Sequence, residues 1–254
     1  MIYIDKIRER VHEHLNIVYK ETTISTNDDV KEYVMKKNEG VVYIASEQLK
    51  GRGRIGHDFS SPKGGIYLSL YIDAKNIKKD QLSIITPLCA VAIYRAIKDT
   101  LFKETQIKWI NDLLYEGKKV CGILAEAMVD KDNNINGIIL GIGIDYKVDV
   151  KKMDKALQDI VGTLYKDGER EDSKTELIIA IINNIYSMCK NLPSVEFLNE
   201  YRAHCITIGK DVSYEINGQI RCAKAIGILD DGTLEVNENG CIYSLNAGEV
   251  SLKK

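Results

Sequence analysis

The chain has 254 residues, 44% of them hydrophobic, which is enough for one large domain or for a large and a small one. Its 35 basic and 37 acidic residues leave a net charge of −2, so it lacks the positive surplus that a bulk electrostatic grip on nucleic acid requires. The six cysteines include no Cys-x-x-Cys pair and the four histidines form no ligand cluster, which argues against a zinc site and for reduced thiols.

The first third of the chain is predicted to alternate helices and strands. Residues 1–20 carry charges throughout and no apolar run reaches membrane-spanning length, so we expect neither a signal peptide nor a membrane span, and a cytoplasmic location. Helical spacing at the start is shown by Ile4, Ile7, Val11 and Leu15. A strand over 17–23, a helix over 25–37 and a strand over 40–48 follow. Residues 65–73 alternate as a strand, with one face formed by Ile66, Leu68, Leu70 and Ile72 and the other by Tyr67, Ser69 and Tyr71.

The middle of the chain is predicted to form the rest of a sheet and its covering helices. A long helix with a wide apolar face is expected over 80–101. Residues 105–129 predict a strand, a turn at Glu116–Gly117 and a second strand, and 135–145 pairs back as an antiparallel strand after a turn at 130–134. Two or three helices follow. One is expected to begin at Ser173, with Ser173 and Glu176 as a capping box, and to end near Pro193.

From residue 207 the pattern changes to short alternating segments separated by turn dipeptides, at Asn217–Gly218, Asp231–Gly232 and Asn239–Gly240. Such a run of hairpins predicts a small antiparallel β-barrel, which is too short for a core of its own and should lean on the larger domain. The predicted class is therefore α+β: a mixed sheet flanked by helices in 1–206 and a small β-barrel in 207–254.

The loop "GRGRIGHDFSSPKGG" (51–65) has the composition of an anion site. Gly51 and Gly53 allow the backbone to approach a ligand, and Arg52 and Arg54 offer planar donors for carboxylate and phosphate. Phe59 offers a ring for stacking. No Gly-Lys-Ser/Thr follows, so this is not a Walker loop. The alternative is a solvated, basic surface turn.

The stretch "KWINDLLYEGKKVCGILAE" (108–126) places polar groups at the ends of two predicted strands. The first strand is expected to end with Lys108, Asn111 and Asp112, and the second to begin with Lys118 and Lys119, shortly before Gly122. A lysine entering a buried strand is unusual because the core disfavours an unpaired charge. The alternative is that both lysines lie in the hairpin turn and face water.

Five motifs occur in one order: "STN" (25–27), "GRGRIG" (51–56), "KWIND" (108–112), "KKVCGILAE" (118–126) and "GIGID" (141–145). Together they closely resemble the biotin–protein ligases, also called biotin–[acetyl-CoA-carboxylase] ligases, over nearly the whole chain. The resemblance implies a class II synthetase-like catalytic domain with an SH3-like β-barrel. It also implies that biotin and ATP, with Mg²⁺, form biotinyl-5′-AMP, from which biotin passes to a lysine of a biotin carboxyl carrier domain of a carboxylase or decarboxylase.

The resemblance also implies roles for individual residues. The catalytic cations are expected to be Lys119, Arg52 and Arg54. Biotin is expected to contact Ser25, Thr26, Asn27, Gln48, Arg52, Gly53, Arg54, Lys119 and Gly122. The nucleotide is expected near Phe59, Lys108, Asn111 and Asp145. The loop over 49–59 is expected to be mobile without ligand and to close over the adenylate, which is prone to hydrolysis.

Four positions depart from the family pattern. His57 stands where arginine is common, Phe59 where tryptophan is common, Ile110 where proline is usual and Asp145 where asparagine is usual. An ionised Asp145 cannot donate a hydrogen bond, which puts nucleotide affinity in doubt if the asparagine reads adenine. The alternative for Asp145 is a strand end that faces solvent.

Two rival functions stay open at this stage. A lipoate or octanoate ligase of the related fold is the nearest enzyme, although "GRGR" and "KWIND" argue against it. A nucleic-acid-binding module that uses the arginine–glycine loop is the rival from another class. Only one predicted helix precedes "STN" at residue 25, so no DNA-binding domain and no specific DNA binding are expected. Metal ligands and the oligomeric state, a homodimer included, are left open.

Overall fold

The computed structural model describes residues 2–252 apart from 13, 38, 74–76, 78, 133, 166–171, 217, 247 and 249. Its main sheet has seven strands, in the spatial order β1 (Asn16–Thr23), β2 (Val41–Gln48), β3 (Ile66–Asp73), β7 (Ile135–Ile144), β6 (Lys118–Val129), β5 (Asp112–Tyr115) and β4 (Gln106–Lys108). Strands β1 and β2 are parallel and all other neighbours are antiparallel. The sheet is therefore mixed, as predicted.

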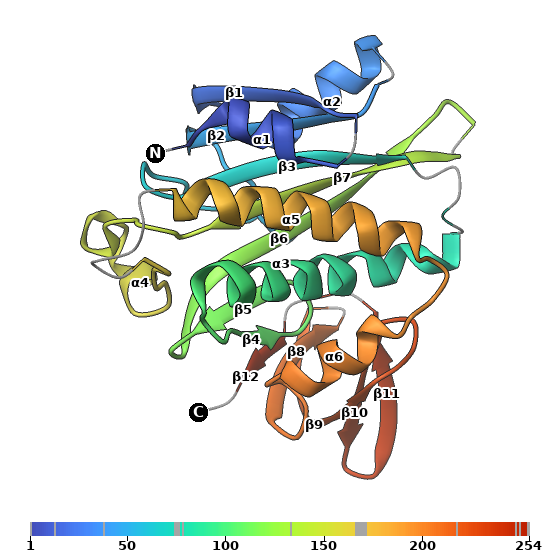
Figure 1. The fold of residues 1–254 in the computed structure, drawn as a ribbon. Coiled ribbons are helices and arrows are strands. Elements are labelled where there is room, and N and C mark those ends of the chain that lie inside the picture. The colour runs from blue at the N-terminus through green and yellow to red at the C-terminus, as the bar shows by residue number, and fades with distance from the viewer. Residues whose placement is uncertain are drawn as a thin grey trace.

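Both faces of the sheet are covered by helices (Figure 1). The even-numbered residues of β3, such as Leu68 and Leu70, join the main core beneath α3 (Ile85–Leu101) and α5 (Ser173–Lys190). Tyr71 points the other way, into a smaller cluster with Val30 and Val34 of α2 (Thr26–Lys37). Because residues alternate between the faces of a strand, α2 must lie on the face opposite to α3 and α5.

The predicted strand over 105–115 is wrong, because the chain reverses within it. Strands β4 and β5 pair with each other, and residues 109–111 form the turn between them. The turn is held from outside the sheet: the backbone N–H of Trp109 donates to Thr207 Oγ1 (3.0 Å) and its indole N–H donates to the Gly232 carbonyl (3.0 Å). The turn at Glu116–Gly117 is confirmed, with positive φ at both residues (50° and 75°), as a tight hairpin between twisted strands requires.

Two further helix boundaries differ from expectation. The opening helix α1 (Ile4–Arg10) ends well before Leu15. The helix expected from residue 80 is preceded by the 3₁₀ segment η2 (Lys79–Ile84), and α3 itself begins at Ile85. The remaining short elements are η1 (Arg54–Gly56), η3 (Val150–Lys152), α4 (Lys155–Gln158) and α6 (Phe197–His204).

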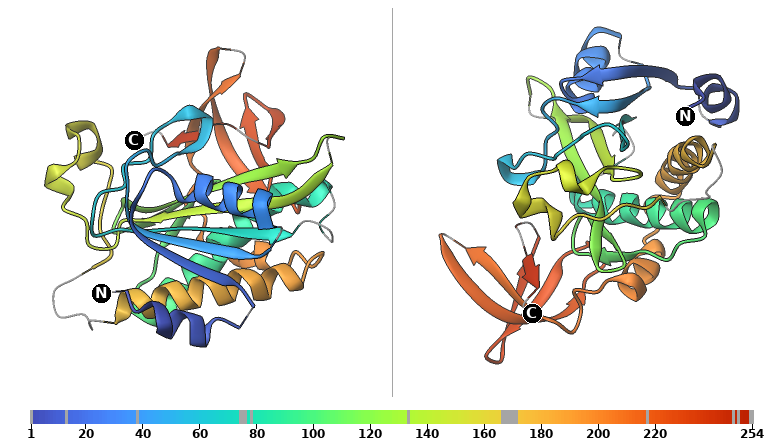
Figure 2. Two further views of the ribbon diagram at one scale, coloured as in Figure 1. Left: turned by 90° about the horizontal axis from the view of Figure 1, so that it is seen from above. Right: turned by 90° about the vertical axis from the view of Figure 1, so that its left-hand side faces the viewer.

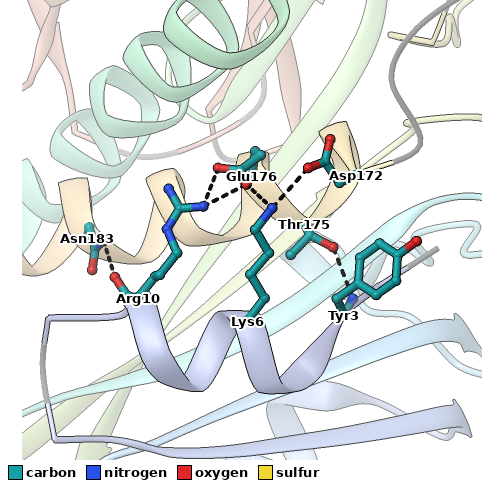
Figure 3. A network of polar contacts seen from close by, with 7 residues as sticks. All are labelled: Tyr3, Lys6, Arg10, Asp172, Thr175, Glu176 and Asn183. Carbon is teal, nitrogen blue, oxygen red and sulfur yellow. Dashed lines mark hydrogen bonds and ion pairs between the residues drawn. The ribbon is translucent and has the colours of Figure 1, made fainter.

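Ionic contacts clasp α1 to α5 (Figure 3). The Lys6 ammonium lies 2.9 Å from Asp172 and 2.6 Å from Glu176, and Arg10 binds both oxygens of Glu176 at 2.7 and 2.8 Å. The predicted capping box at Ser173 is wrong: Asp172 occupies the N-cap, and the Glu176 carboxylate turns to α1. The backbone of α1 adds a bond from the Tyr3 N–H to Thr175 Oγ1 (3.0 Å).

A second antiparallel sheet follows, as predicted. Its spatial order is β11 (Cys241–Leu245), β10 (Leu234–Glu238), β9 (Gln219–Ile228), β8 (Asp211–Ile216) and β12 (Val250–Leu252). Positive φ at Gly218, Gly232 and Asn239 agrees with the predicted turns, although Asn217 lies outside the described residues. Figure 2 shows this sheet set to one side of the main one, and Figure 1 shows β4 and β5 as the strands of the main sheet next to it. A single cluster of buried hydrophobic residues includes side chains of both sheets, so the small sheet packs against the main one and shares its core.

Within the described part of the chain, no helix is long and apolar enough to cross a membrane. All six cysteines are free thiols, as expected, and three of them are buried in the core: Cys89, Cys121 and Cys205.

Candidate active site

A cavity of about 260 Å³ lies where the start of α2, the loop between β2 and β3, the β4–β5 turn and strands β6 and β7 meet. Every residue predicted for the site except Asp145 lines it: Ser25, Thr26, Asn27, Gln48, Arg52, Gly53, Arg54, Phe59, Lys108, Asn111, Lys119 and Gly122. The second sheet also reaches the cavity, through Gly248, Val250 and Ser251. The fold therefore gathers side chains that are far apart in the sequence.

One end of the cavity is lined by uncharged side chains rich in hydrogen-bonding groups, and the Glu126 carboxylate accepts a hydrogen bond there from Asn27 Nδ2 (2.5 Å). Gln48 Oε1 accepts from the backbone N–H (2.8 Å) and the hydroxyl (3.0 Å) of Thr26, and its amide donates to Ser61 Oγ (2.9 Å). Ser69 donates to Asn27 Oδ1 (2.5 Å), and its Oγ lies 2.6 Å from the Thr26 hydroxyl. These side chains are held in fixed orientations by one another, which prepares them for a ligand with amide-like groups.

The floor of the cavity is made of glycine backbone on β6 and β7. A Cβ on Gly141 would lie 2.2 Å from Asn27 Oδ1, and one on Gly143 would lie 2.3 Å from the Phe59 ring. At Gly122 the same addition would meet the Phe59 ring at 2.8 Å. The lack of a side chain at Gly122 and Gly143 therefore leaves the room in which the Phe59 ring contacts these two strands.

The arginine–glycine loop is folded over the cavity as a small hairpin. An antiparallel bridge joins Arg52 to Asp58, and the Gly53 N–H donates to the His57 carbonyl (2.6 Å). The loop is exposed at Arg52, Gly56 and Asp58, as the alternative of a solvated surface turn expects, and it also lines the cavity through Arg52, Arg54 and Phe59.

Both loop arginines contact polar groups of the protein. Arg52 forms ion pairs with Asp28 (2.8 Å) and Glu126 (3.0 Å), while Arg54 donates to Asn111 Oδ1 and the Gly248 carbonyl, both at 3.3 Å. Both arginines therefore have polar partners in the protein itself. A ligand must compete with Asp28 and Glu126 for Arg52.

Lys119 supplies the cation nearest to the glycine floor. Its Nζ forms a 2.6 Å ion pair with Asp112 and lies 5.7 Å from the centre of the Phe59 ring. Lys119 begins β6 and its side chain is about one quarter exposed (27%), so the alternative of a water-facing turn lysine is wrong for it. Lys118 is directed elsewhere and donates to the carbonyl of Asp159. Only the second lysine of the pair therefore serves the cavity.

Asp145 lies beneath the site rather than in its lining. Its residue is 2% exposed, and its Oδ1 makes no hydrogen bond with any described residue. Burial raises the pKa of this carboxyl to about 7, and the nearby Lys119 ammonium opposes that rise. The alternative of a solvent-facing strand end is wrong. Tyr67 faces Asp145 from β3, and burial together with the Asp145 charge raises the pKa of its phenol.

Two of the remaining departures from the family pattern also have defined places. His57 lines the cavity within the loop, and Ile110 is buried in the β4–β5 turn, where the Trp109–Ile110 peptide bond is cis. The sequence interpretation missed three acidic partners, Asp28, Asp112 and Glu126. Asp112 and Glu126 stand in the motifs "KWIND" and "KKVCGILAE", but neither motif shows that these carboxylates pair with Lys119 and Arg52.

The described residues contain no group of three or more His, Cys, Asp or Glu side chains that could hold a metal ion. Carboxylates do line the cavity, at Asp58 and Asp112. One or two carboxylates together with substrate phosphates are the usual protein environment of Mg²⁺, so the donor set fits a metal that arrives with a nucleotide.

Comparison with known proteins gives consistent relatives. Residues 19–145, half of the chain, match the model of the biotin/lipoate A/B protein ligase family. The chain is 28% identical to the bifunctional ligase/repressor BirA of Bacillus subtilis over 93% of this chain and 74% of that protein. It is 26% identical to the biotin–[acetyl-CoA-carboxylase] ligase of Mycobacterium tuberculosis over 84% of this chain and 79% of that one. The structure of Aquifex aeolicus biotin protein ligase in complex with biotin and ATP superposes with a TM-score of 0.78 at 25% identity, covering 94% and 99% of the two chains.

Proposed function

Because the chain belongs to the biotin/lipoate A/B protein ligase family, we propose that it is a biotin–protein ligase. It activates biotin with ATP to biotinyl-5′-AMP and transfers biotin to a lysine of a biotin carboxyl carrier domain. The relatives named as biotin ligases and the Aquifex complex with biotin and ATP support this choice of substrates.

The observation that carries the proposal is that one cavity is lined by the uncharged side chains of Thr26, Asn27 and Gln48 and also by the cations Arg54 and Lys119. Biotin presents a counterpart to each, with an uncharged ureido ring at one end and a carboxylate at the other. We assign the ring to the side of Thr26, Asn27 and Gln48, whose hydrogen bonds hold them in place. The carboxylate lies toward Lys119 and the loop arginines, where ATP brings its α-phosphate.

The first step brings two anions together. A biotin carboxylate oxygen attacks the α-phosphorus, the bond to the β-phosphate oxygen breaks, and pyrophosphate leaves with the electron pair. Lys119, Arg52 and Arg54 offset the repulsion and the added charge of the transition state. The Asp112 carboxylate forms an ion pair with the Lys119 ammonium, in the position that a substrate anion would take. Asp112 therefore keeps Lys119 oriented when no ligand is bound.

Further assignments follow from the same placement. Biotin contacts include Ser25, Gly53 and Gly122, and nucleotide contacts include Phe59, Lys108 and Asn111. Asp145 acts from beneath the lining, where its charge state depends on pH near neutrality. Mg²⁺ accompanies ATP and neutralises phosphate charge, with Asp112 and Asp58 as the carboxylates within reach of the cavity.

The acceptor is a carrier domain of a biotin-dependent carboxylase or decarboxylase, and the reaction is cytoplasmic. Residues 1–206 form the catalytic unit and 207–254 the small C-terminal unit, which contributes Gly248, Val250 and Ser251 to the cavity. We expect no sequence-specific DNA binding, which a gel shift with biotin present tests. Size-exclusion chromatography distinguishes a monomer from the homodimer that the sequence leaves open.

One experiment separates this function from its rivals. The protein is incubated with ATP and Mg²⁺ and, in turn, with biotin, lipoate or octanoate, and pyrophosphate release is measured. Release with biotin alone is expected. Release with lipoate or octanoate in preference to biotin would make the protein the other kind of ligase in its family. No release with any acid, together with salt-sensitive RNA binding, would favour the nucleic-acid-binding module.

A further inference from the structure

A second cavity, of about 340 Å³, lies next to the first. The two cavities share Arg54, Ile123 and Leu124 in their linings. The second is completed by the start of α3 and by Asn246, which follows β11. Arg54 therefore stands between the adenylation cavity and a separate space that reaches the boundary of the small sheet.

The second step of the proposed reaction needs such a space. The ε-amine of the acceptor lysine must reach the carbonyl carbon of biotinyl-5′-AMP while the adenylate fills the first cavity. The arginine–glycine loop lines that cavity, and the Phe59 ring packs against the glycines of β6 and β7 in it. An incoming lysine therefore requires a route that does not pass through the loop, because opening the loop would admit water to a hydrolysable anhydride.

We propose that this second cavity receives the acceptor lysine and leads its amine past Arg54 to the adenylate. The inference rests on the proposed biotin ligase function and adds a subsite for the protein substrate. Its walls suit the side chain: Leu82, Ile110 and Ala125 offer apolar surface for the four methylene groups. Ser83, Thr86 and Asn246 add polar atoms along the same space.

The charge at the inner end suits the reacting form of lysine. Only the neutral amine is a nucleophile, and a fixed cation nearby lowers the pKa of an ammonium group. Arg54 supplies that cation, and Lys119 lies beyond it in the first cavity. The amine nitrogen then bonds to the carbonyl carbon, the bond from that carbon to the phosphate oxygen breaks, and AMP leaves with the electron pair. One proton of the amine is released to water.

The second cavity is also placed where a protein can reach it. Strand β5 pairs with β6 only from Lys118 to Gly122. Ala125, which lines the cavity, lies on the part of β6 beyond this pairing, so none of the described strands covers that side of it. A folded carrier domain can therefore approach this edge with its lysine extended.

Substitution at the mouth tests the proposal with the two steps measured apart. Thr86→Phe narrows the cavity from the first turn of α3, and Thr86→Val is the matched control that leaves its volume nearly unchanged. Biotinyl-5′-AMP formation is measured by pyrophosphate release. Transfer is then measured from isolated adenylate complex to a purified biotin carboxyl carrier domain and to hydroxylamine, an amine small enough to pass through a narrowed cavity.

Thr86→Phe is expected to form the adenylate at the parental rate, to react normally with hydroxylamine, and to transfer biotin to the carrier domain about tenfold more slowly or worse. Parental transfer to the carrier domain would overturn the proposal. Slower adenylate formation would assign the cavity to the first step, and equally slow hydroxylamine discharge would mean altered chemistry rather than blocked access. Ala125→Leu, from the opposite wall, replaces Thr86→Phe if that variant does not fold. A parent protein that makes no biotinyl-5′-AMP would refute the proposed function instead.

Discussion

Replacing Asp145 by asparagine should change the pH dependence of stability. Relative to the parent, the free energy of unfolding of the variant should be higher at pH 8 than at pH 5. Burial holds the pKa of this carboxyl at about 7, compared with an ordinary value of 3.8. The folded chain therefore binds the proton more tightly than the unfolded chain does. The resulting stability is complete below pH 3.8 and is lost as the pH rises through about 7. The full difference corresponds to about 4 kcal/mol, of which about 2 to 3 kcal/mol falls between pH 5 and pH 8.

The amide of Asp145→Asn keeps the shape of the carboxyl and does not titrate in this range. Urea unfolding at pH 5 and at pH 8 should show the free energy of unfolding of the variant, relative to the parent, rising by about 2 to 3 kcal/mol between the two. Asp99→Asn, at an exposed position of α3, is the control and should show no comparable change. An equal difference between Asp145→Asn and parent at both pH values would refute the claim that burial raises the pKa of Asp145.

Three further outcomes are expected. Lys119→Ala should lower biotin-dependent pyrophosphate exchange by about tenfold to a hundredfold or more with an unchanged circular dichroism spectrum, because a charge-assisted contact is worth about 1.5–3 kcal/mol. The side chain of Lys118 lies outside the cavity, so Lys118→Ala should retain activity. Equal rates for both variants would remove Lys119 from the mechanism. Biotin with ATP and Mg²⁺ should protect the loop over 49–59 from trypsin more than ATP alone does, and equal cleavage with and without ligands would mean that the loop does not close over the intermediate. Glu176→Gln should lower the free energy of unfolding by about 1 kcal/mol at pH 7. Hydrogen bonds from Lys6 and then Arg10 lower the pKa of Glu176, so this loss of stability should vanish in acid, where the parental carboxylate is protonated. A variant that stays less stable than the parent in acid would owe its loss to packing instead.

Elements with an unbroken hydrophobic period were predictable from the sequence. Strand β3 and helix α5 follow their patterns, and the Glu116–Gly117 turn has the left-handed backbone that its residues favour. The failures share one cause, which is that a distant contact decides the local outcome. Residues 105–115 read as one strand, but Trp109 is bonded to Thr207 and Gly232, and these contacts fix a turn. No local pattern reveals a partner about 100 positions away.

The same limit applies to the candidate site. Motifs identified the residues that line the cavity, because short segments such as "STN" and "GRGRIG" keep their chemistry close together. The motifs did not identify which charged side chains form ion pairs with each other. The pairing of Arg52 with Asp28 and Glu126, and of Lys119 with Asp112, depends on how β6 lies against the loop. Asp145 shows this most clearly, since its burial follows from the fold and not from the residues around it.

The clasp between α1 and α5 has a consequence for synthesis of the protein. Helix α1 leaves the ribosome before α5, because the carboxylate partners of Lys6 and Arg10 lie 166 residues further along the chain. A seven-residue helix is not stable in water by itself, so α1 must stay unfolded while most of the catalytic unit is being translated. Its apolar Ile7 is exposed during that interval, and the segment is then available to a chaperone. Stalled nascent chains should lose protease sensitivity at residues 4–10 only after α5 has emerged.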